Sequence, residues 1–176
     1  MTAGGGMDFP GLWQGAIPYG SFAAEVQELR GLWEGIYKKA TIPDWALEQA
    51  RARGQGAHFL VINEDWCWDA ANTIPVLAKL CDQAGAMELR LIHRDENPEV
   101  MDRYLTNGAR SIPVVIVLDA EFRELGHWGP RPSELQAWAG ANKSKMEKSE
   151  FYTEMRRWHV KDGGHSMLRE VLEILQ

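Results

Sequence analysis

Apolar positions along this chain recur first at helical spacing, between residues 22 and 36. Phe22, Val26, Leu29, Trp33 and Ile36 follow one another at intervals of three or four residues. This spacing places all five side chains on one face, so the pattern predicts a single amphipathic helix.

Further along, extended and helical patterns alternate. Residues 57–62 are apolar almost throughout, which predicts a central strand that is buried on both faces. The remaining pattern predicts strands at 87–93, 113–118 and 122–128, and helices at 44–53, 68–84, 98–105 and 133–142.

This order of elements predicts an α/β fold with a mixed four-stranded sheet flanked by helices. A right-handed crossover makes strands 57–62 and 87–93 parallel, and the hairpin adds antiparallel strands beside them. We divide the chain into four parts: a flexible N-terminal arm (1–20), an N-terminal helical extension (21–54), an α/β core (55–142) and a C-terminal helical extension (143–176).

Composition narrows the class of protein. The formal net charge is −6, which argues against nucleic acid or an anionic membrane surface as the partner. No apolar run reaches the ~18 residues of a membrane span, and the first residues do not resemble a secretory signal. Two cysteines make a disulfide scaffold improbable, so we expect a cytoplasmic, reducing location. The five histidines are scattered without metal-ligand spacing, so we expect no bound metal. For the oligomeric state, a monomer and a homodimer both remain open.

Candidate chemistry is concentrated where the central strand passes into the helix at 68–84. The sequence there is Trp66-Cys67-Trp68-Asp69-Ala70. It resembles the W-C-x-x-C motif of the thioredoxin superfamily, with alanine in place of the second cysteine. Pro75 stands where that family has a helix-kinking proline, and Arg110-Ser-Ile-Pro113 resembles its cis-proline loop. The likeness covers about residues 55–140 and points to a bacterial thioredoxin-like subfamily.

The resemblance implies a site at the helix start. Backbone N–H groups and the helix dipole there favour a thiolate, which makes Cys67 the candidate catalytic residue. Pro113 is expected to be cis, and Ile112 to offer its backbone to an extended peptide. We expect tryptophan side chains to surround the same groove, and these are Trp66, Trp68 and Trp128.

Other residues at the motif work against a reactive thiol. Ala70 cannot resolve a mixed disulfide, and Val61 stands where the family has a buried proton-handling acid. Nearby negative charge raises a thiol pKa, and three carboxylates adjoin the motif: Glu64, Asp65 and Asp69. Two arginines are expected to offset them, Arg110 and Arg131, so the sequence predicts a Cys67 that is only mildly acidified.

Two functions are consistent with these features. The first is a monothiol protein, a candidate thiol-disulfide oxidoreductase, in which Cys67 attacks a protein, peptide or glutathione-like disulfide and an external thiol resolves the product. The second is a non-catalytic binding module that holds a peptide or protein in the Ile112–Pro113 groove, with Cys67 a relic. We expect no bound cofactor; an iron–sulfur cluster shared with glutathione, as in some monothiol relatives, is disfavoured by the acidic motif.

Overall fold

The computed structural model describes residues 5–175. Its helices are α1 (Phe9–Gly15), α2 (Tyr19–Glu25), α3 (Arg30–Lys39), α4 (Asp44–Arg53), α5 (Trp68–Ala84), α6 (Pro98–Met101), α7 (Ser133–Asn142), α8 (Lys148–Asp162) and α9 (His165–Ile174). Its strands are β1 (Ile17–Pro18), β2 (His58–Asn63), β3 (Glu88–His93), β4 (Val114–Leu118) and β5 (Glu124–Trp128). Most boundaries agree with the sequence pattern, although α6 ends at Met101 instead of near residue 105.

The strands form one mixed sheet in the order β1-β3-β2-β4-β5. β2 is central, because it pairs parallel with β3 and antiparallel with β4, and its residues from Phe59 to Asn63 are fully buried. The sheet has one strand more than the predicted four. The extra strand, β1, pairs antiparallel with β3, with Ile17 opposite Leu91. A two-residue strand leaves no alternating pattern in the sequence, so the predicted number of strands was wrong.

The N-terminal arm is ordered over its described part. Asp8 caps α1 by accepting a hydrogen bond from the backbone N–H of Gly11 at 3.0 Å, and Phe9 and Trp13 are buried. The ring of Trp13 meets that of His58 edge-on, with 4.7 Å between the ring centres, which fixes α1 to the start of β2. The described part of this arm thus forms α1 and β1 and packs against the core, while residues 1–4 lie outside the described part of the chain.

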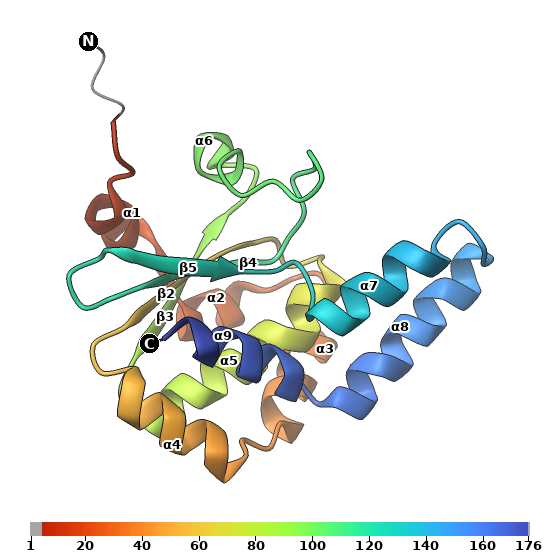
Figure 1. Cartoon of the computed structure of the whole chain (residues 1–176), viewed down its shortest axis with the longest axis horizontal. Helices are drawn as coiled ribbons and strands as arrows, with labels where there is room; N and C mark the ends of the chain where they lie inside the picture. Colours follow the sequence, from red (N-terminus) through yellow and green to blue (C-terminus); the bar gives the residue numbers. More distant parts are fainter. Residues whose placement is uncertain (1–4, 176) are drawn as a thin grey trace.

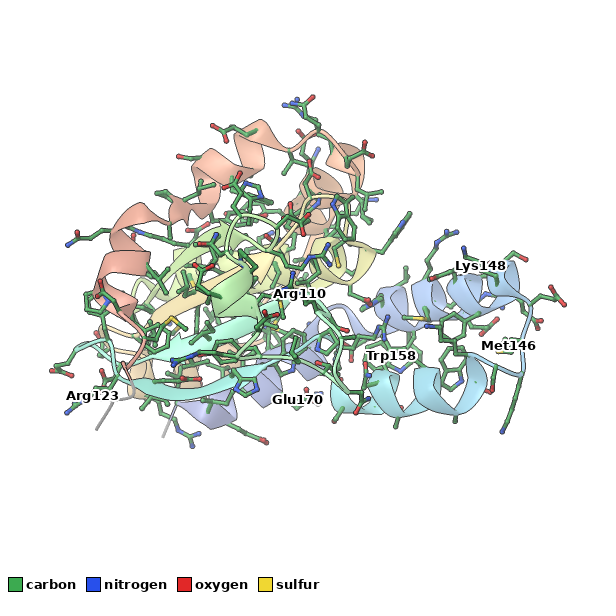
Figure 2. The ribbon with its side chains drawn as sticks, turned by 90° about the horizontal axis from the view of Figure 1, so that it is seen from above. Arg110, Arg123, Met146, Lys148, Trp158 and Glu170 are labelled. Atoms are coloured by element: carbon green, nitrogen blue, oxygen red, sulfur yellow. The ribbon has the colours of Figure 1, made fainter. Side chains whose placement is uncertain are left out.

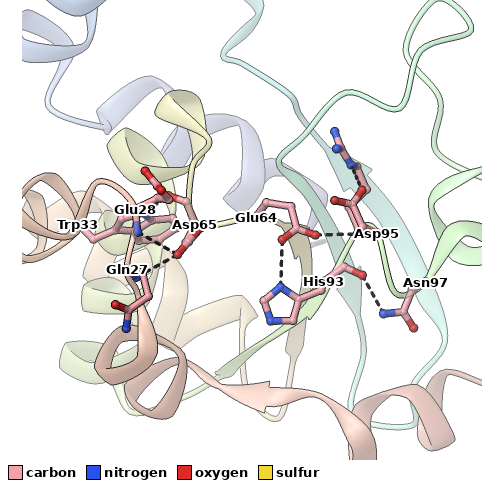
Figure 3. Close-up of polar contacts among 9 residues, drawn as sticks. Gln27, Glu28, Trp33, Glu64, Asp65, His93, Asp95 and Asn97 are labelled. Atoms are coloured by element: carbon pink, nitrogen blue, oxygen red, sulfur yellow. Dashed lines mark hydrogen bonds and ion pairs between the residues drawn. The ribbon is translucent and has the colours of Figure 1, made fainter.

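The single helix expected over residues 22–36 is two helices, α2 and α3, separated at a left-handed Leu29 (φ 55°). A long-range contact explains the break. One carboxylate oxygen of Asp65 accepts the backbone N–H groups of Gln27 and Glu28 at 3.0 and 3.1 Å (Figure 3). The indole N–H of Trp33 donates to the backbone carbonyl of Asp65 at 2.8 Å. These bonds replace the helical ones that the break removes.

Helices cover both faces of the sheet (Figure 1). α1 and α6 lie on one face, and α5, α4 and α9 lie on the other. α7 and α8 form a hairpin that extends beyond the sheet and has a small core of its own, made of Leu135, Ala139, Phe151 and Met155. Gly163 and Gly164 then turn the chain back, so that α9 packs against β5 and α4. None of the described helices is long and apolar enough to cross a membrane.

Candidate functional site

Cys67 stands at the junction between the central strand and the longest helix. It is the N-cap residue of α5, and only 7% of its surface is exposed. The first N–H groups of a helix have no partner within the helix, and they favour negative charge nearby. In this chain the backbone N–H groups of Ala70 and Asp69 lower the pKa of the Cys67 thiol, as the motif predicts.

Burial outweighs that stabilisation. Loss of hydration raises the pKa of Cys67 to about 11, the negative charge of Asp69 adds to the rise, and the cationic Arg131 only partly opposes it. The thiol also donates a hydrogen bond to the backbone carbonyl of Ile112, with 3.4 Å between Sγ and O. The prediction of a mildly acidified cysteine is therefore wrong, because the sequence did not show how deeply this side chain is enclosed.

Two proline loops meet beside the thiol. The Ile112–Pro113 and Gly129–Pro130 peptide bonds are both cis. At Gly129, with φ at +124°, a Cβ atom would lie 2.1 Å from the carbonyl oxygen of Pro113. Only glycine allows the two loops to pack this closely. Their contact positions Arg131, which follows the second proline, next to the cysteine motif.

Asp69 connects this motif to the C-terminal extension. Its carboxylate accepts a hydrogen bond from Nε of Arg131 at 2.9 Å, and its other oxygen lies 3.2 Å from Nε2 of His159. The side chains of Asp69 and His159 are only 13% and 6% exposed. His159 belongs to α8, so this buried bridge joins the predicted core to a segment that the sequence treated as an appendage.

The other two acidic residues of the motif are engaged elsewhere (Figure 3). Asp65 holds the α2–α3 break. Glu64 accepts a hydrogen bond from the backbone N–H of Asp95 and lies 3.1 Å from Nδ1 of His93. Of the three neighbouring carboxylates, Asp69 is the one whose charge raises the pKa of Cys67.

Two cavities open beside Cys67. The larger, about 530 Å³, lies between the cysteine motif and the two proline loops. The smaller, about 330 Å³, lies between the motif and α8. Trp66, Cys67 and Arg131 line both. A ligand in either cavity would therefore meet the thiol.

Tryptophans flank the thiol on its exposed side. Trp66 and Trp68 are 45% and 42% exposed, which is unusual for such large apolar side chains. The guanidinium groups of Arg94 and Arg156 lie over their rings, at 5.0 and 4.6 Å from the ring centres. Each tryptophan is thereby held in place while much of its surface stays open to a ligand.

Trp128, the third tryptophan expected at the groove, lines neither cavity. It is buried at the end of β5, where its indole N–H donates to the carboxylate of Glu170 at 2.6 Å. The same carboxylate accepts both the backbone N–H and the hydroxyl of Ser133, at the start of α7. Glu170, labelled in Figure 2, belongs to α9, which packs against β5. Trp128 therefore fastens α9 and α7 to the sheet.

Arg110, expected beside the motif, lines the larger cavity and pairs with Asp102 through two hydrogen bonds of 2.7 and 2.9 Å. Sequence reasoning missed three further residues at the site, Arg94, Arg156 and His159. Arg94 follows the strand parallel to β2, so the shared carboxyl edge of the two strands could have indicated it. Nothing in the sequence connects the other two, on α8, with Cys67.

The second cysteine lies elsewhere. Cys81 is buried near the opposite end of α5, about 20 Å away at 1.5 Å per residue. Burial raises the pKa of its thiol, and it lines a separate cavity of about 580 Å³ with Tyr37 and Asp82. No other cysteine can resolve a bond formed at Cys67. Among residues 5–175 there is also no group of three or more acidic, histidine or cysteine side chains placed to hold a metal.

Comparison with known proteins assigns the chain to a family. A family model described as thioredoxin matches residues 18–155, and the chain belongs to the thioredoxin family. The match begins at β1 and continues into α8, so it is wider than the resemblance expected from the motifs. A comparison with curated proteins finds no match.

Two solved structures share the fold. One is a protein of unknown function from Pseudomonas aeruginosa, 20% identical, aligned over 96% of this chain and 97% of that chain with a TM-score of 0.77. The other is an HIV epitope scaffold, also 20% identical with the same coverage, and its TM-score is 0.72. At this level of identity the likeness concerns the fold alone.

Proposed function

We propose that this protein handles thiols through Cys67 alone. The Cys67 thiolate attacks one sulfur of a disulfide, forms a mixed disulfide and releases the other half as a thiolate. An external thiol then attacks the mixed disulfide, so that Cys67 returns to the reduced state and the external thiol leaves bonded to the captured half. The observation that carries this proposal is the position of Cys67, in the wall of both cavities at the start of α5, with Ala70 in place of a resolving cysteine.

The high pKa of Cys67 determines the pace of both steps. With a pKa of about 11, only about one molecule in ten thousand carries the thiolate at pH 7. Attack is therefore slow. A thiol of high pKa is also a poor leaving group, so the mixed disulfide persists once it has formed. We conclude that the site is suited to capturing a partner for a long time, and less to rapid turnover.

The test is to incubate the protein with oxidised glutathione at several pH values and to record its intact mass. We expect one adduct per chain, formed faster at alkaline pH, located on Cys67 by peptide mapping and removed by dithiothreitol. The Cys67→Ser variant should form none. An adduct on Cys81, or no adduct at any pH, would contradict the proposal.

A second function, peptide binding without redox chemistry, is favoured by the exposed face of Trp66, which lines the same cavity as Ile112, and by that of Trp68, which lines the smaller cavity. An exposed aromatic side chain next to a groove is a typical binding anchor. Cys67→Ser separates the two functions, because it abolishes covalent capture and leaves an aromatic groove intact. A partner retained equally by Cys67→Ser and by the natural chain would favour the binding module.

A further inference from the structure

The wall of the larger cavity at Cys67 is rich in arginine, although the molecule as a whole is acidic. The chain carries 25 acidic against 19 basic residues. The larger cavity nevertheless includes Arg94, Arg110 and Arg131 in its wall, with Asp95 as its acidic residue. The smaller cavity adds Arg156 on α8 together with the acidic Asp69. Each of the three arginines in the larger cavity pairs with an aspartate, so the wall is marked by a concentration of guanidinium N–H donors, and such donors recognise anionic ligands.

All three arginines of the larger cavity are held in position by partners, Arg110 by Asp102 as described above. Arg131 donates through Nε to Asp69 at 2.9 Å and through Nη1 to the side-chain oxygen of Gln136 at 3.2 Å. Arg94 donates through Nε to Asp95 at 3.0 Å and through Nη1 to the backbone carbonyl of Arg110 at 3.3 Å. These bonds fix the planes of the guanidinium groups and reduce the entropy lost when a ligand binds.

Each guanidinium keeps one terminal nitrogen for a ligand. Arg110 bonds Asp102 through Nε and Nη2. Among residues 5–175, Nη1 of Arg110 and Nη2 of both Arg94 and Arg131 have no hydrogen-bond partner. Guanidinium N–H groups bind carboxylate and phosphate oxygens well, since the interaction is charge-assisted.

We infer that the larger cavity binds a low-molecular-weight disulfide or thiol that carries anionic oxygen groups, carboxylate or phosphate, and presents its sulfur to Cys67. This inference rests on the proposed function and names its substrate class. A volume of about 530 Å³ is in the range of small-molecule sites. The arginines bind the charged ends, and Trp66 covers the apolar part of the ligand.

The first experiment compares oxidised glutathione with its carboxylate ester, which has the same disulfide without the carboxylate charges. We expect the natural chain to react about tenfold faster with the acid than with the ester, and the difference to shrink as salt is added. In the double variant Arg94→Gln, Arg110→Gln the acid and the ester should react within about twofold of each other. Coenzyme A disulfide, which carries phosphates, shows which anionic group is preferred.

Arg123→Gln is the matched control. Arg123 is an exposed arginine paired with Asp119, as Arg110 is with Asp102, but it lies on the β4–β5 hairpin far from Arg110 (Figure 2). Arg123→Gln removes one arginine charge outside the cavity and should leave the preference unchanged. Equal rates for the acid and the ester in the natural chain, or the same loss of preference in Arg123→Gln, would overturn the inference and leave the proposed function standing.

Binding without chemistry gives an independent result. S-methylglutathione cannot form a disulfide, so its affinity for Cys67→Ser, measured by calorimetry, reports the anion site alone. We expect S-methylglutathione to bind Cys67→Ser, and we expect its affinity to fall by about tenfold when Arg94→Gln and Arg110→Gln are added. If it binds but no disulfide reacts with the natural chain, the proposed function fails and the anion site stands. If it does not bind, the inference fails.

Discussion

The Sγ atom of Cys67 lies 3.4 Å from the carbonyl oxygen of Ile112 and donates a hydrogen bond to it. A thiolate has no proton to donate, so ionisation breaks this bond and places a negative charge beside a carbonyl dipole. The contact and the burial of the side chain therefore act in the same direction: both favour the neutral thiol. The backbone N–H groups at the start of α5 do lower the pKa of Cys67, but burial raises it by more.

Ala70→Cys should restore a resolving thiol. Ala70 lies three residues after Cys67, in the first turn of α5. A cysteine there would attack the mixed disulfide at Cys67 and expel the captured partner. We expect the adduct with oxidised glutathione to give way to an intramolecular disulfide, seen by intact mass as the loss of two hydrogen atoms. The variant that carries Cys67→Ser as well should form no internal disulfide. Persistence of the adduct in Ala70→Cys would contradict this.

Asp69→Asn should make Cys67 more acidic and the protein less stable. The substitution removes the negative charge that raises the pKa of Cys67 and turns the ion pair with Arg131 into a weaker, neutral hydrogen bond. It also weakens the bridge to His159, at a cost of about 1–3 kcal/mol in the free energy of unfolding. The pH dependence of alkylation and denaturant unfolding measure the two effects.

His159→Gln separates charge from structure at this bridge. It weakens the same contact but leaves the carboxylate of Asp69 in place. We expect a loss of stability without a fall in the pKa of Cys67. If both variants lowered the pKa equally, general loosening of the site would be the cause, not the charge of Asp69.

Trp68→Ala should weaken ligand binding without unfolding the protein. Because the side chain is 42% exposed and its main contact is Arg156 over the ring, we expect a stability loss below about 1 kcal/mol. The affinity for a captured partner should fall by about fivefold or more. Leu125→Ala is the control, since Leu125 is equally exposed on β5 and lines neither cavity at Cys67. Equal affinity in the natural chain and Trp68→Ala would defeat this prediction.

Asp65→Ala should loosen the N-terminal segment that packs against the cysteine loop. Without the carboxylate, the backbone N–H groups of Gln27 and Glu28 lose their acceptor. We expect these two amides to exchange hydrogen at least tenfold faster, with a stability loss of about 1–3 kcal/mol. Asp65→Asn, which keeps an acceptor oxygen, should be milder. Unchanged exchange in Asp65→Ala would show that other contacts hold this break.

Local patterns predicted the parts of the fold that depend on them. The apolar run of β2, the helix from Trp68 to Ala84 and the break at Gly163–Gly164 leave periodic or glycine signals in the sequence. The break between α2 and α3 leaves no such signal. It depends on Asp65, which is distant in sequence, so periodicity alone suggested an unbroken helix.

The same distinction applies to the site. Cys67 and Ile112 were found because short motifs mark them. His159 and Arg156 approach the thiol from α8, and no local pattern indicates that a C-terminal helix folds back onto the motif. The pKa of Cys67 was missed for a related reason. Charges can be counted from the sequence, whereas enclosure depends on the whole tertiary structure.

The most direct test of this account is the rate at which iodoacetamide alkylates Cys67 between pH 7 and pH 11, resolved from Cys81 by peptide mass. The folded pKa lies above that of a free thiol, so the reactive thiolate appears only as the pH rises toward about 11. We predict a rate that still increases about tenfold per pH unit up to about pH 10, whereas the rate for a free thiol, with a pKa of about 8.5, levels off at about that pH. A rate that has reached its plateau by about pH 10 would show an ordinary or acidified thiol and would contradict a Cys67 held in the neutral form by burial.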